Sequence, residues 1–445
     1  MKFIASKELE ATTDRSFDRR VLIVVENLPV PFDRRVWSEA TTLRAAGYTV
    51  SVICPTGKGF DAPYEEIDGI HIYRHTLPLD ARGALGYLRE YSSALFHEAR
   101  LAFKVKRRHG FDVIHGCNPP DLIFLVAWLF RPFGVRFLFD HHDISPELFE
   151  AKFGKRGLLY RVTRFFEKLT FKSAMVSIAT NDSYKDIAVR RGGMEPDDVF
   201  VVRSGPKIEK LQIREPKPEL KKGFKHLVGY VGVIGAQEGM DLLIDAAEHV
   251  VRDLGRDDIH FGIVGGGPEL ETIQTDVRQR GLEKYFTFTG RAPDDLLLDM
   301  LNTADICVNP DRVTPMNDLS TMNKILEYMT LKKPIVQFDM HEGRVSAGDA
   351  SVYAAKNDPR DFGDKIVELI DDPERRRAMG EIGRKRIIDM YSWDHSVPML
   401  LAAYNRIFEK IGQKVRPGAR AEDYPAPSVV TPERPLYRKT VEKSH

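Results

Sequence analysis

The sequence is poor in cysteine and has no long apolar run. Its three cysteines, Cys54, Cys117 and Cys307, have no partners at the spacing of a metal site. This predicts reduced, buried thiols in a reducing compartment and excludes a disulfide framework. No apolar stretch approaches the roughly 20 residues that span a bilayer, and residues 1–20 lack the apolar core of a secretory signal. We therefore expect a cytoplasmic protein.

The chain also lacks an excess of charge of either sign. Its 66 Lys and Arg residues balance 65 Asp and Glu residues, which gives a formal net charge of +1. Such a balance supplies no global field for nucleic acid, so we expect no nucleic-acid partner, and any basic surface must be local. Hydrophobic residues make up 42% of the 445 residues, which argues against wholesale disorder, and the length favours two domains.

Strand-like runs alternate with helical patterns through both halves of the chain. The first unit comprises a β-branched run at 21–25, a helix that begins near Asp33 and a strand at 49–54. Strands separated by helices predict parallel sheets covered by helices. The predicted fold class is α/β, with two Rossmann-like, doubly wound domains facing each other across a cleft.

Composition divides the chain further. A segment rich in Pro, Lys and Glu separates the two α/β series, and the end of the chain repeats Pro and charge without a period, which predicts disorder. The predicted segments are a lead-in at 1–20, an N-terminal domain at 21–204, a linker at 205–225, a C-terminal domain at 226–395, an amphipathic helix at 396–414 and a disordered tail at 415–445.

Two glycine-rich loops follow predicted strands of the C-terminal domain. A turn between a strand and a helix exposes backbone N–H groups at the positive helix end, which favours phosphate. Either loop alone is as readily a purely structural turn, but two loops at adjacent strand ends would approach one ligand. The candidate phosphate-binding glycines are Gly232, Gly235, Gly265, Gly266 and Gly267.

The stretch 317–329 combines hydrogen-bonding side chains with a predicted helix start. If the helix begins near Ser320 or Thr321, Lys324 and Glu327 lie on one face close to its first turn. Lys324 could then neutralise a pyrophosphate, and Glu327 could accept hydrogen bonds from a ribose diol. The alternative is a surface Lys–Glu pair of little energetic consequence. The candidate ligand-binding residues are Asp318, Ser320, Thr321, Asn323, Lys324 and Glu327.

The order of these motifs resembles glycosyltransferase family 4. The resemblance rests on Gly265-Gly266-Gly267-Pro268, Phe288-Thr289-Gly290, Ala304-Asp305-Ile306, Leu326-Glu327-Tyr328-Met329 and Pro334-Ile335-Val336, and in the N-terminal half on Asp33-Arg34-Arg35-Val36-Trp37 and Asp112-Val113-Ile114-His115. It implies a GT-B-type fold with an acceptor-binding N-terminal domain and a nucleotide-sugar-binding C-terminal domain. It also implies hexosyl transfer with retention of anomeric configuration, without a catalytic metal or other cofactor.

The sequence departs from the family pattern at two places in the C-terminal domain. Glu327 falls on the position that contacts the nucleotide ribose in the family, but Leu319 replaces its usual glutamate partner, with Asp318 as a neighbouring substitute. The usual Arg and Lys of the first loop are missing, so we expect Lys324 to act as the phosphate cation. The run Asn317 to Lys324 resembles a subgroup involved in bacterial surface-polysaccharide assembly.

Candidate acceptor-binding residues follow the predicted strand 136–139. His142 and Asp143 would project into the cleft, where His142 could handle protons near neutral pH, and Glu147 is a further candidate for acceptor binding. The alternative is a buried structural histidine. Many relatives carry a histidine where Cys117 stands in this chain.

A segment between Lys152 and Lys172 interleaves basic and aromatic residues, which suits an anionic membrane surface. The alternative is a core helix with a solvated basic face.

The predicted function is a retaining glycosyltransferase that uses a nucleotide sugar and a glycan or lipid-linked acceptor at the inner face of the plasma membrane. A sugar-nucleotide 2-epimerase on the same fold and an inactive nucleotide-sugar-binding protein remain alternatives.

Overall fold

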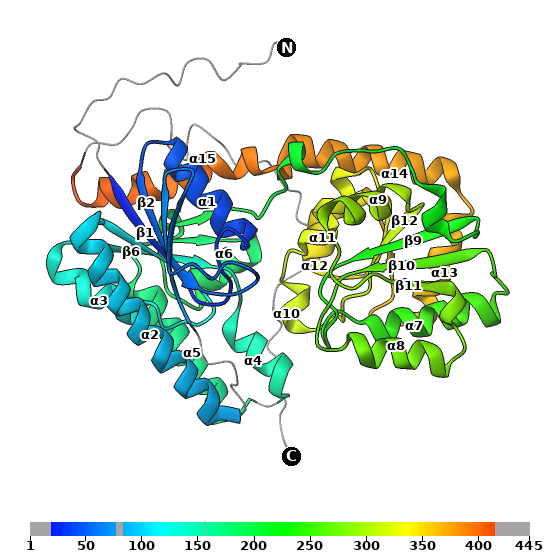
Figure 1. The fold of residues 1–445 in the computed structure, drawn as a ribbon, viewed down its shortest axis with the longest axis horizontal. Helices are drawn as coiled ribbons and strands as arrows, with labels where there is room; N and C mark the ends of the chain where they lie inside the picture. Colours follow the sequence, from blue (N-terminus) through cyan, green and yellow to red (C-terminus); the bar gives the residue numbers. More distant parts are fainter. Residues whose placement is uncertain (1–18, 77–82, 155, 414–445) are drawn as a thin grey trace, which may run out of the picture.

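The computed structural model describes residues 19–76, 83–154 and 156–413. The predicted disordered tail at 415–445 and nearly all of the predicted lead-in at 1–20 lie outside the described residues. Two α/β domains lie side by side and confirm the predicted fold class (Figure 1). Within the described residues, no helix is long and apolar enough to cross a bilayer.

The N-terminal domain is built on an eight-stranded sheet in the order β3-β4-β2-β1-β5-β6-β7-β8. All neighbours pair in parallel except β3, which pairs with β4 in antiparallel orientation. The central strands are buried along almost their whole length because helices cover both faces. The strands are β1 Arg20–Val25, β2 Thr49–Pro55, β3 Tyr64–Ile67, β4 Ile70–His75, β5 Val113–Cys117, β6 Arg136–His141, β7 Val176–Ala179 and β8 Val199–Val201.

Helices on the two faces of this sheet bury separate apolar clusters. One cluster packs the strands against α1 and α15, and the other packs them against α2, α3, α5 and α6. Helix α1 begins after Asp33 because this carboxylate accepts the N–H groups of Arg35 and Val36. The helices are α1 Arg34–Ala45, α2 Gly83–Arg108, α3 Phe124–Phe130 with the 3-10 turn η2 Arg131–Phe133, α4 Ser145–Phe153, α5 Leu158–Ser173 and α6 Asp182–Arg190.

The C-terminal domain has a six-stranded, fully parallel sheet in the order β11-β10-β9-β12-β13-β14. Its strands are β9 His226–Val231, β10 Ile259–Val264, β11 Phe286–Phe288, β12 Ile306–Asn309, β13 Ile335–Phe338 and β14 Ser351–Ala354. Its helices are α7 Met240–Glu248, α8 Leu270–Gln279, α9 Asp294–Thr303, α10 Pro315–Asp318, α11 Asn323–Thr330, α12 His341–Ala347, α13 Pro359–Ile370 and α14 Pro373–Arg386.

The chain crosses between the domains twice. The predicted linker region lies over α9, where Lys217 Nζ is 2.7 Å from Asp299 Oδ2. After α14 the chain returns, and helix α15, Trp393–Lys410, packs on the N-terminal domain, where it buries Leu400 and Tyr404 (Figure 1). The two crossings are tied together, because the amide of Trp393 donates to the carbonyl of Pro206 at 3.0 Å.

Candidate functional site

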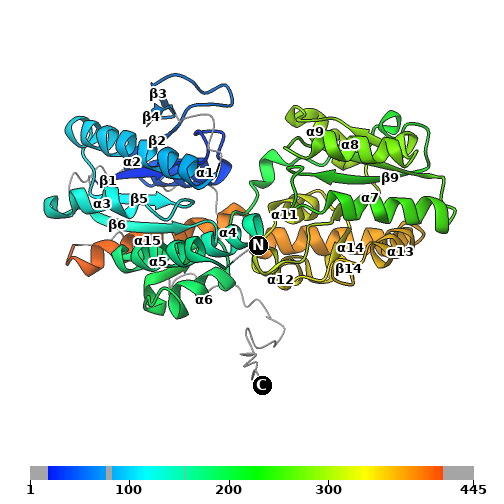
Figure 2. The same cartoon turned by 90° about the horizontal axis from the view of Figure 1, so that it is seen from below.

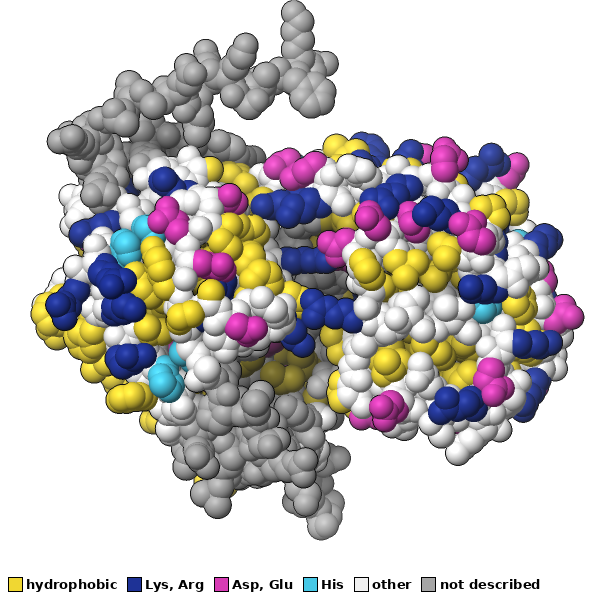
Figure 3. Space-filling model, in the orientation of Figure 1, with side chains coloured by type: hydrophobic (Ala, Val, Ile, Leu, Met, Phe, Trp, Pro, Cys, Tyr) yellow, Lys and Arg dark blue, Asp and Glu magenta, His cyan; other side chains and the backbone are white. Residues whose placement is uncertain are grey.

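The site lies between the domains, where loops that follow strands of both sheets meet. Figure 2 shows α4 of one domain and α11 of the other at this junction. Figure 3 shows the surface hollowed between the domains, with Lys and Arg side chains along the hollow. Open parallel sheets bind ligands at the carboxyl ends of their strands, so this gap is the expected place for a substrate.

Glu327 faces this gap. Its Oε1 lies 3.1 Å from Nη1 of Arg34, which stands at the start of α1 in the opposite domain. Arg34 also approaches Asp294 at 3.6 Å. Burial raises the pKa of Glu327 above its usual value, and the nearby Arg34 offsets part of this rise. A carboxylate of this kind is positioned to accept hydrogen bonds from a ligand that enters the gap.

Lys324 lies against the first glycine loop, beside Gly232. Its Nζ lies 2.6 Å from Oδ1 of Asp311 and 3.5 Å from the hydroxyl of Tyr230, and its Cε lies 3.3 Å from where a Cβ on Gly232 would stand. Burial alone would lower the pKa of Lys324, but Asp311, together with Tyr230 and Glu238, more than offsets this effect, and the pKa lies above its ordinary value. Lys324 is therefore cationic, and in the absence of ligand Asp311 balances its charge.

The helix that carries Lys324 and Glu327 starts later than predicted. We expected a start near Ser320 or Thr321, but α11 begins at Asn323. The reason is that Ser320 and Thr321 reach across to α6: Ser320 Oγ lies 2.9 Å from the Tyr184 hydroxyl, and Thr321 Oγ1 accepts from the Asn181 amide at 3.1 Å. These two candidate residues thus hold the two domains together.

The remaining candidates of this stretch have different surroundings. Asp318 Oδ1 accepts the amide N–H of His341 at 2.9 Å, at the start of α12, and Asn323 is exposed. Leu319, which replaces the family's glutamate, packs with Met316 against the apolar cluster of α2, α3, α5 and α6 in the N-terminal domain. An apolar contact between the domains thus takes the place of a carboxylate.

The two glycine loops pack directly against each other. Gly265 has φ +151°, and a Cβ there would lie 1.8 Å from the carbonyl oxygen of Gly232; a Cβ on Gly267 would lie 2.2 Å from that of Ile234. The space beside Gly266 is wider, because the nearest atom to a Cβ there is the amide nitrogen of Arg291 at 3.7 Å. A Cβ on Gly235 would meet Glu238 Oε2 at 2.7 Å. Close packing therefore requires glycine at 232, 265 and 267 whether or not phosphate binds.

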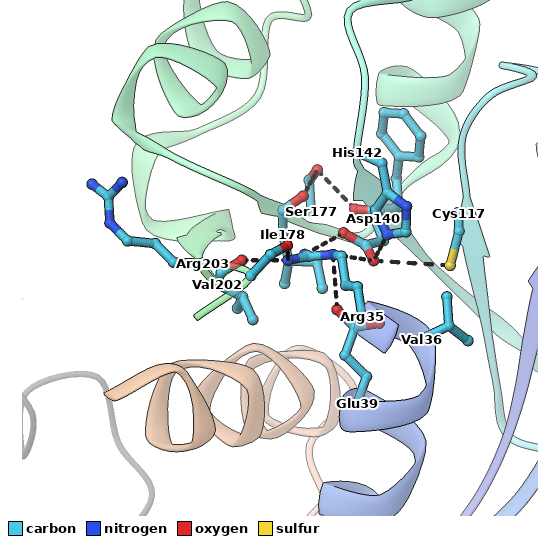
Figure 4. A network of polar contacts seen from close by, with 12 residues as sticks. Arg35, Val36, Glu39, Cys117, Asp140, His142, Ser177, Ile178, Val202 and Arg203 are labelled. Carbon is cyan, nitrogen blue, oxygen red and sulfur yellow. Dashed lines mark hydrogen bonds and ion pairs between the residues drawn. The ribbon is translucent and has the colours of Figure 1, made fainter. Parts of the chain in front are cut away.

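In the N-terminal domain, a buried charge network lies at the ends of β5 and β6 (Figure 4). The Arg35 guanidinium donates to Asp140 Oδ1 at 2.7 Å and lies 3.2 Å from Glu39 Oε1. His142 Nε2 makes a short contact with the same Asp140 carboxylate. Burial alone would raise the pKa of Asp140, but Arg35 and His142 hold it well below its usual range. Asp140 is therefore an ionised group that fixes the His142 ring.

Four members of this region, Glu39, His115, Cys117 and Asp140, have ligand-type atoms within 4.8 Å of one another. Burial raises the pKa of Glu39 well above its usual value and lowers that of His115, which favours the neutral form of each side chain. The Arg35 cation already balances the remaining carboxylate. Arg35 thus already supplies a cation to this cluster, which forms an ion-pair and hydrogen-bond network.

The two other acceptor candidates differ from each other. Asn118 Oδ1 accepts the amide N–H groups of His142 at 2.7 Å and Asp143 at 3.2 Å, which holds the loop after β6 in place. Burial raises the pKa of Asp143 above its usual value. Glu147 instead pairs with Arg191 inside the N-terminal domain and is 7% exposed, which leaves it little freedom to bind an acceptor.

Sequence reasoning missed two basic residues at the gap. Arg34 belongs to the motif after the first strand but was given no role, although it contacts Glu327. Arg291 follows the Phe288-Thr289-Gly290 turn, and its guanidinium carbon lies 4.5 Å from the ring centroid of Phe32 in the opposite domain. Arg34 follows the proline-marked loop after the first strand, and Arg291 follows Gly290; these loop positions were the signal available in the sequence. All three cysteines are free and buried, as expected.

Comparisons with known proteins agree with this architecture. The family models "Glycosyl transferase 4-like domain" and "Glycosyl transferases group 1" match residues 33–205 and 225–372. Alpha-maltose-1-phosphate synthase of Mycolicibacterium smegmatis is 25% identical over 302 residues, covering 62% of this chain and 74% of the relative. Sucrose-phosphate synthase from Thermosynechococcus elongatus superimposes with a TM-score of 0.70 at 18% identity, covering 88% of this chain and 100% of the other.

Anabaena Alr3699/HepE, solved in complex with UDP-glucose, superimposes with a TM-score of 0.62 at 14% identity over 86% of this chain and 98% of the other. These structural likenesses establish the fold, and the two family models cover the two domains in turn. The chain is a glycosyltransferase of the GT-B type and belongs to the group 1, or family 4, glycosyltransferases.

Proposed function

We propose that the protein is a retaining, metal-independent hexosyltransferase that moves a sugar from a nucleotide sugar to a glycan or lipid-linked acceptor in bacterial surface-polysaccharide assembly. The observation that carries the proposal is the placement of Glu327, which faces the gap between the domains opposite Arg34. A similarly folded protein was solved with UDP-glucose, which supports a nucleotide sugar as the donor class.

The donor diphosphate would be held by cations and by backbone N–H groups at the ends of β9 and β10. Lys324 stands next to Gly232, and Arg291 stands next to Gly266. As the sugar–phosphate bond breaks, negative charge develops on the leaving diphosphate, and preorganised donors there stabilise the transition state. Asp311 balances the charge of Lys324 before ligand binds, so Arg291 would supply additional positive charge. Glu327 would accept hydrogen bonds from the ribose.

The acceptor hydroxyl would be oriented from the opposite wall by His142 and Asp143. His142 is held by Asp140, and the N–H groups of both residues are fixed by Asn118. A residue locked in this way can position a hydroxyl without further loss of side-chain freedom. The polar contacts between the domains would then close around both substrates and exclude water, which prevents hydrolysis of the donor.

A thermal-shift screen over UDP-, GDP-, ADP- and dTDP-sugars tests donor binding, because a ligand that binds only the folded state raises stability by about 2.7 kcal/mol at a hundred times its Kd. We expect one nucleotide class to raise the unfolding temperature, and Glu327→Gln and Lys324→Ala to lose most of that rise. Absence of any shift with the wild type would contradict the proposal.

Product analysis with and without acceptor then separates the possible reactions. Transfer requires an acceptor and yields a product of unchanged anomeric configuration, whereas conversion of the nucleotide sugar without acceptor would identify a 2-epimerase. Binding without turnover in the presence of a range of acceptors would identify an inactive binding protein. We expect transfer to continue in the presence of EDTA.

A further inference from the structure

Large apolar side chains are exposed mainly on one face of the N-terminal domain. Among the described residues, nine of the fifteen exposed large hydrophobic side chains belong to α2, α3, η2 and α5. They are Phe96, Phe103, Trp128, Leu129, Phe133, Leu158, Leu159, Val162 and Phe165, with exposures between 38% and 75%. Contiguous apolar surface of this kind marks an interaction site in a soluble domain. We call this surface the α2–α3–α5 face.

The three helices form one continuous surface. The ring of Phe103 on α2 lies 4.7 Å from that of Phe130 on α3, and the Trp128 indole on α3 donates to Ser173 Oγ on α5 at 3.0 Å. Figure 3 shows apolar and basic side chains intermixed on the left of the molecule, where Figure 1 places α2 and α3. The exposed apolar groups therefore belong to one face and are not scattered.

Among the side chains that the structure describes on α2, α3, η2 and α5, the exposed charged ones are all basic. On α2 the exposed stripe reads Phe96, Arg100, Phe103 and Arg107 at helical spacing. On α5 the exposed residues include Arg161, Lys168 and Lys172 beside Leu158, Val162 and Phe165. The acidic residues of α5 and of α2 from residue 91 onward, Glu167 and Glu98, are both buried. In a chain with a net charge of +1, this is a strong local segregation of charge.

We propose that the α2–α3–α5 face docks on the surface of an anionic phospholipid bilayer. Aromatic and aliphatic groups would enter the interface while Lys and Arg contact the headgroups, which is the pattern of peripheral membrane helices. The sequence pointed only to the segment 152–172. The structure adds α2, α3 and η2, and it shows that Glu167 and Phe171 face the protein interior.

Other occupants fit the chemistry less well. A second copy in a two-fold dimer would bring the same basic surface against itself, so like charges would oppose each other. A nucleic acid would use the basic and aromatic groups, but the aliphatic side chains of Leu129, Leu158, Leu159 and Val162 offer neither hydrogen bonds nor a ring on which a base can stack. An anionic bilayer uses both the apolar and the basic side chains.

The position of the α2–α3–α5 face suits the proposed function, and this part of the proposal rests on that function. Helix α5 follows α4, and α4 begins two residues after Asp143 at the predicted acceptor site. A bilayer under the α2–α3–α5 face would therefore bring a lipid-linked acceptor to the N-terminal wall of the gap. Docking itself requires no donor or acceptor, so its test does not depend on whether transfer is observed.

The test is vesicle flotation of the full chain with phosphatidylcholine vesicles that do or do not contain phosphatidylglycerol. We expect binding only to the anionic vesicles, with a loss at high salt. The basic variant is Arg100→Gln/Arg107→Gln/Lys168→Gln/Lys172→Gln. Its affinity should fall about fivefold per residue, because a Lys or Arg near an anionic leaflet contributes about 1 kcal/mol. A second variant, Phe96→Ser/Phe165→Ser, should also weaken binding.

The matched control replaces four exposed basic residues of the C-terminal domain, Arg278, Lys284, Lys356 and Arg377, by Gln and should bind like the wild type. Failure of the wild type to float with anionic vesicles would overturn the proposal, as would equal binding by the basic variant and the wild type. Conversion of a solution dimer to a monomer by Phe96→Ser/Phe165→Ser would instead assign the face to a second copy.

Discussion

The buried ion pair between Lys324 and Asp311 allows the structural and ligand-binding roles of Lys324 to be separated. The two charged atoms are 2.6 Å apart, and the side chains are 11% and 4% exposed. Lys324→Met would leave the Asp311 carboxylate buried without its cation. Breaking a buried pair from one side costs about 3–5 kcal/mol, because the remaining charge is uncompensated. We expect the C-terminal domain to lose stability by about this amount.

Two further variants separate the roles. The double variant Lys324→Met/Asp311→Asn removes both charges, so most of the lost stability should return. Asp311→Asn alone leaves an ammonium next to Tyr230 and Gly232 without its counter-charge, so its attraction for a diphosphate should be retained or strengthened. Denaturant unfolding measures stability, and the nucleotide-induced thermal shift, taken from each variant's own baseline, measures binding.

Stability and nucleotide binding should respond differently in the double variant. Stability should be low in Lys324→Met and largely restored in the double variant, whereas binding should be weak in both. A loss of less than about 1 kcal/mol in Lys324→Met, which is typical of a surface pair, would refute the assignment of a buried pair. Nucleotide binding by the double variant at wild-type strength would refute a role for Lys324 in holding the donor.

Other residues give further predictions. Burial raises the pKa of Glu98 to about 8 from an ordinary 4.5. The native state therefore binds the proton of Glu98 more tightly than the unfolded state does. The free energy of unfolding is then highest at acid pH and falls as the pH rises from about 4.5 to about 8. Glu98→Gln should remove this loss of about 5 kcal/mol, seen as a flatter profile of the denaturation midpoint against pH. Gly265→Ala should lower the unfolding temperature and abolish the nucleotide-induced thermal shift, because the new Cβ would clash with Gly232. The control Gly281→Ala, at φ +62° with open space around it, should lower the free energy of unfolding by only about 1 kcal/mol. Asp140→Asn should slow transfer to acceptor without weakening the nucleotide shift, since its carboxylate holds His142 in the other domain.

Much of the fold follows from local patterns, because parallel strands buried on both faces appear as apolar runs between helices. The antiparallel pair β3–β4 was missed although its signal is present: Asp68 and Gly69 have φ 52° and 74°, and Asp-Gly is a favoured hairpin turn. The packing of α15 on the N-terminal domain was not predictable in this way. Amphipathicity indicates which face of a helix is buried but not which partner covers it.

The candidate site shows the same limit. The three-residue spacing of Lys324 and Glu327 predicted that both lie close together near the start of one helix, since helical geometry relates them directly. Glu327 contacts the opposite domain, whereas Lys324 lies against Gly232. Asp311 precedes Lys324 by a loop and a short helix, so no sequence spacing indicates that the two side chains meet. The contact of Arg34 with Glu327 joins two domains, and it depends on how they are docked.

The contacts between the two domains link the predicted donor-binding residues to the predicted acceptor-binding domain. Ser320 and Thr321, which precede the helix of Lys324 and Glu327, are bonded to α6 of the N-terminal domain, and Leu319 packs on the same side. Because many of these contacts are polar hydrogen bonds, they can break and reform during domain opening at modest cost. Any opening that moves α6 away would release the segment that leads into α11. The geometry of Lys324 and Glu327 would then depend on closure, so the donor would be gripped fully only when the acceptor wall is in place.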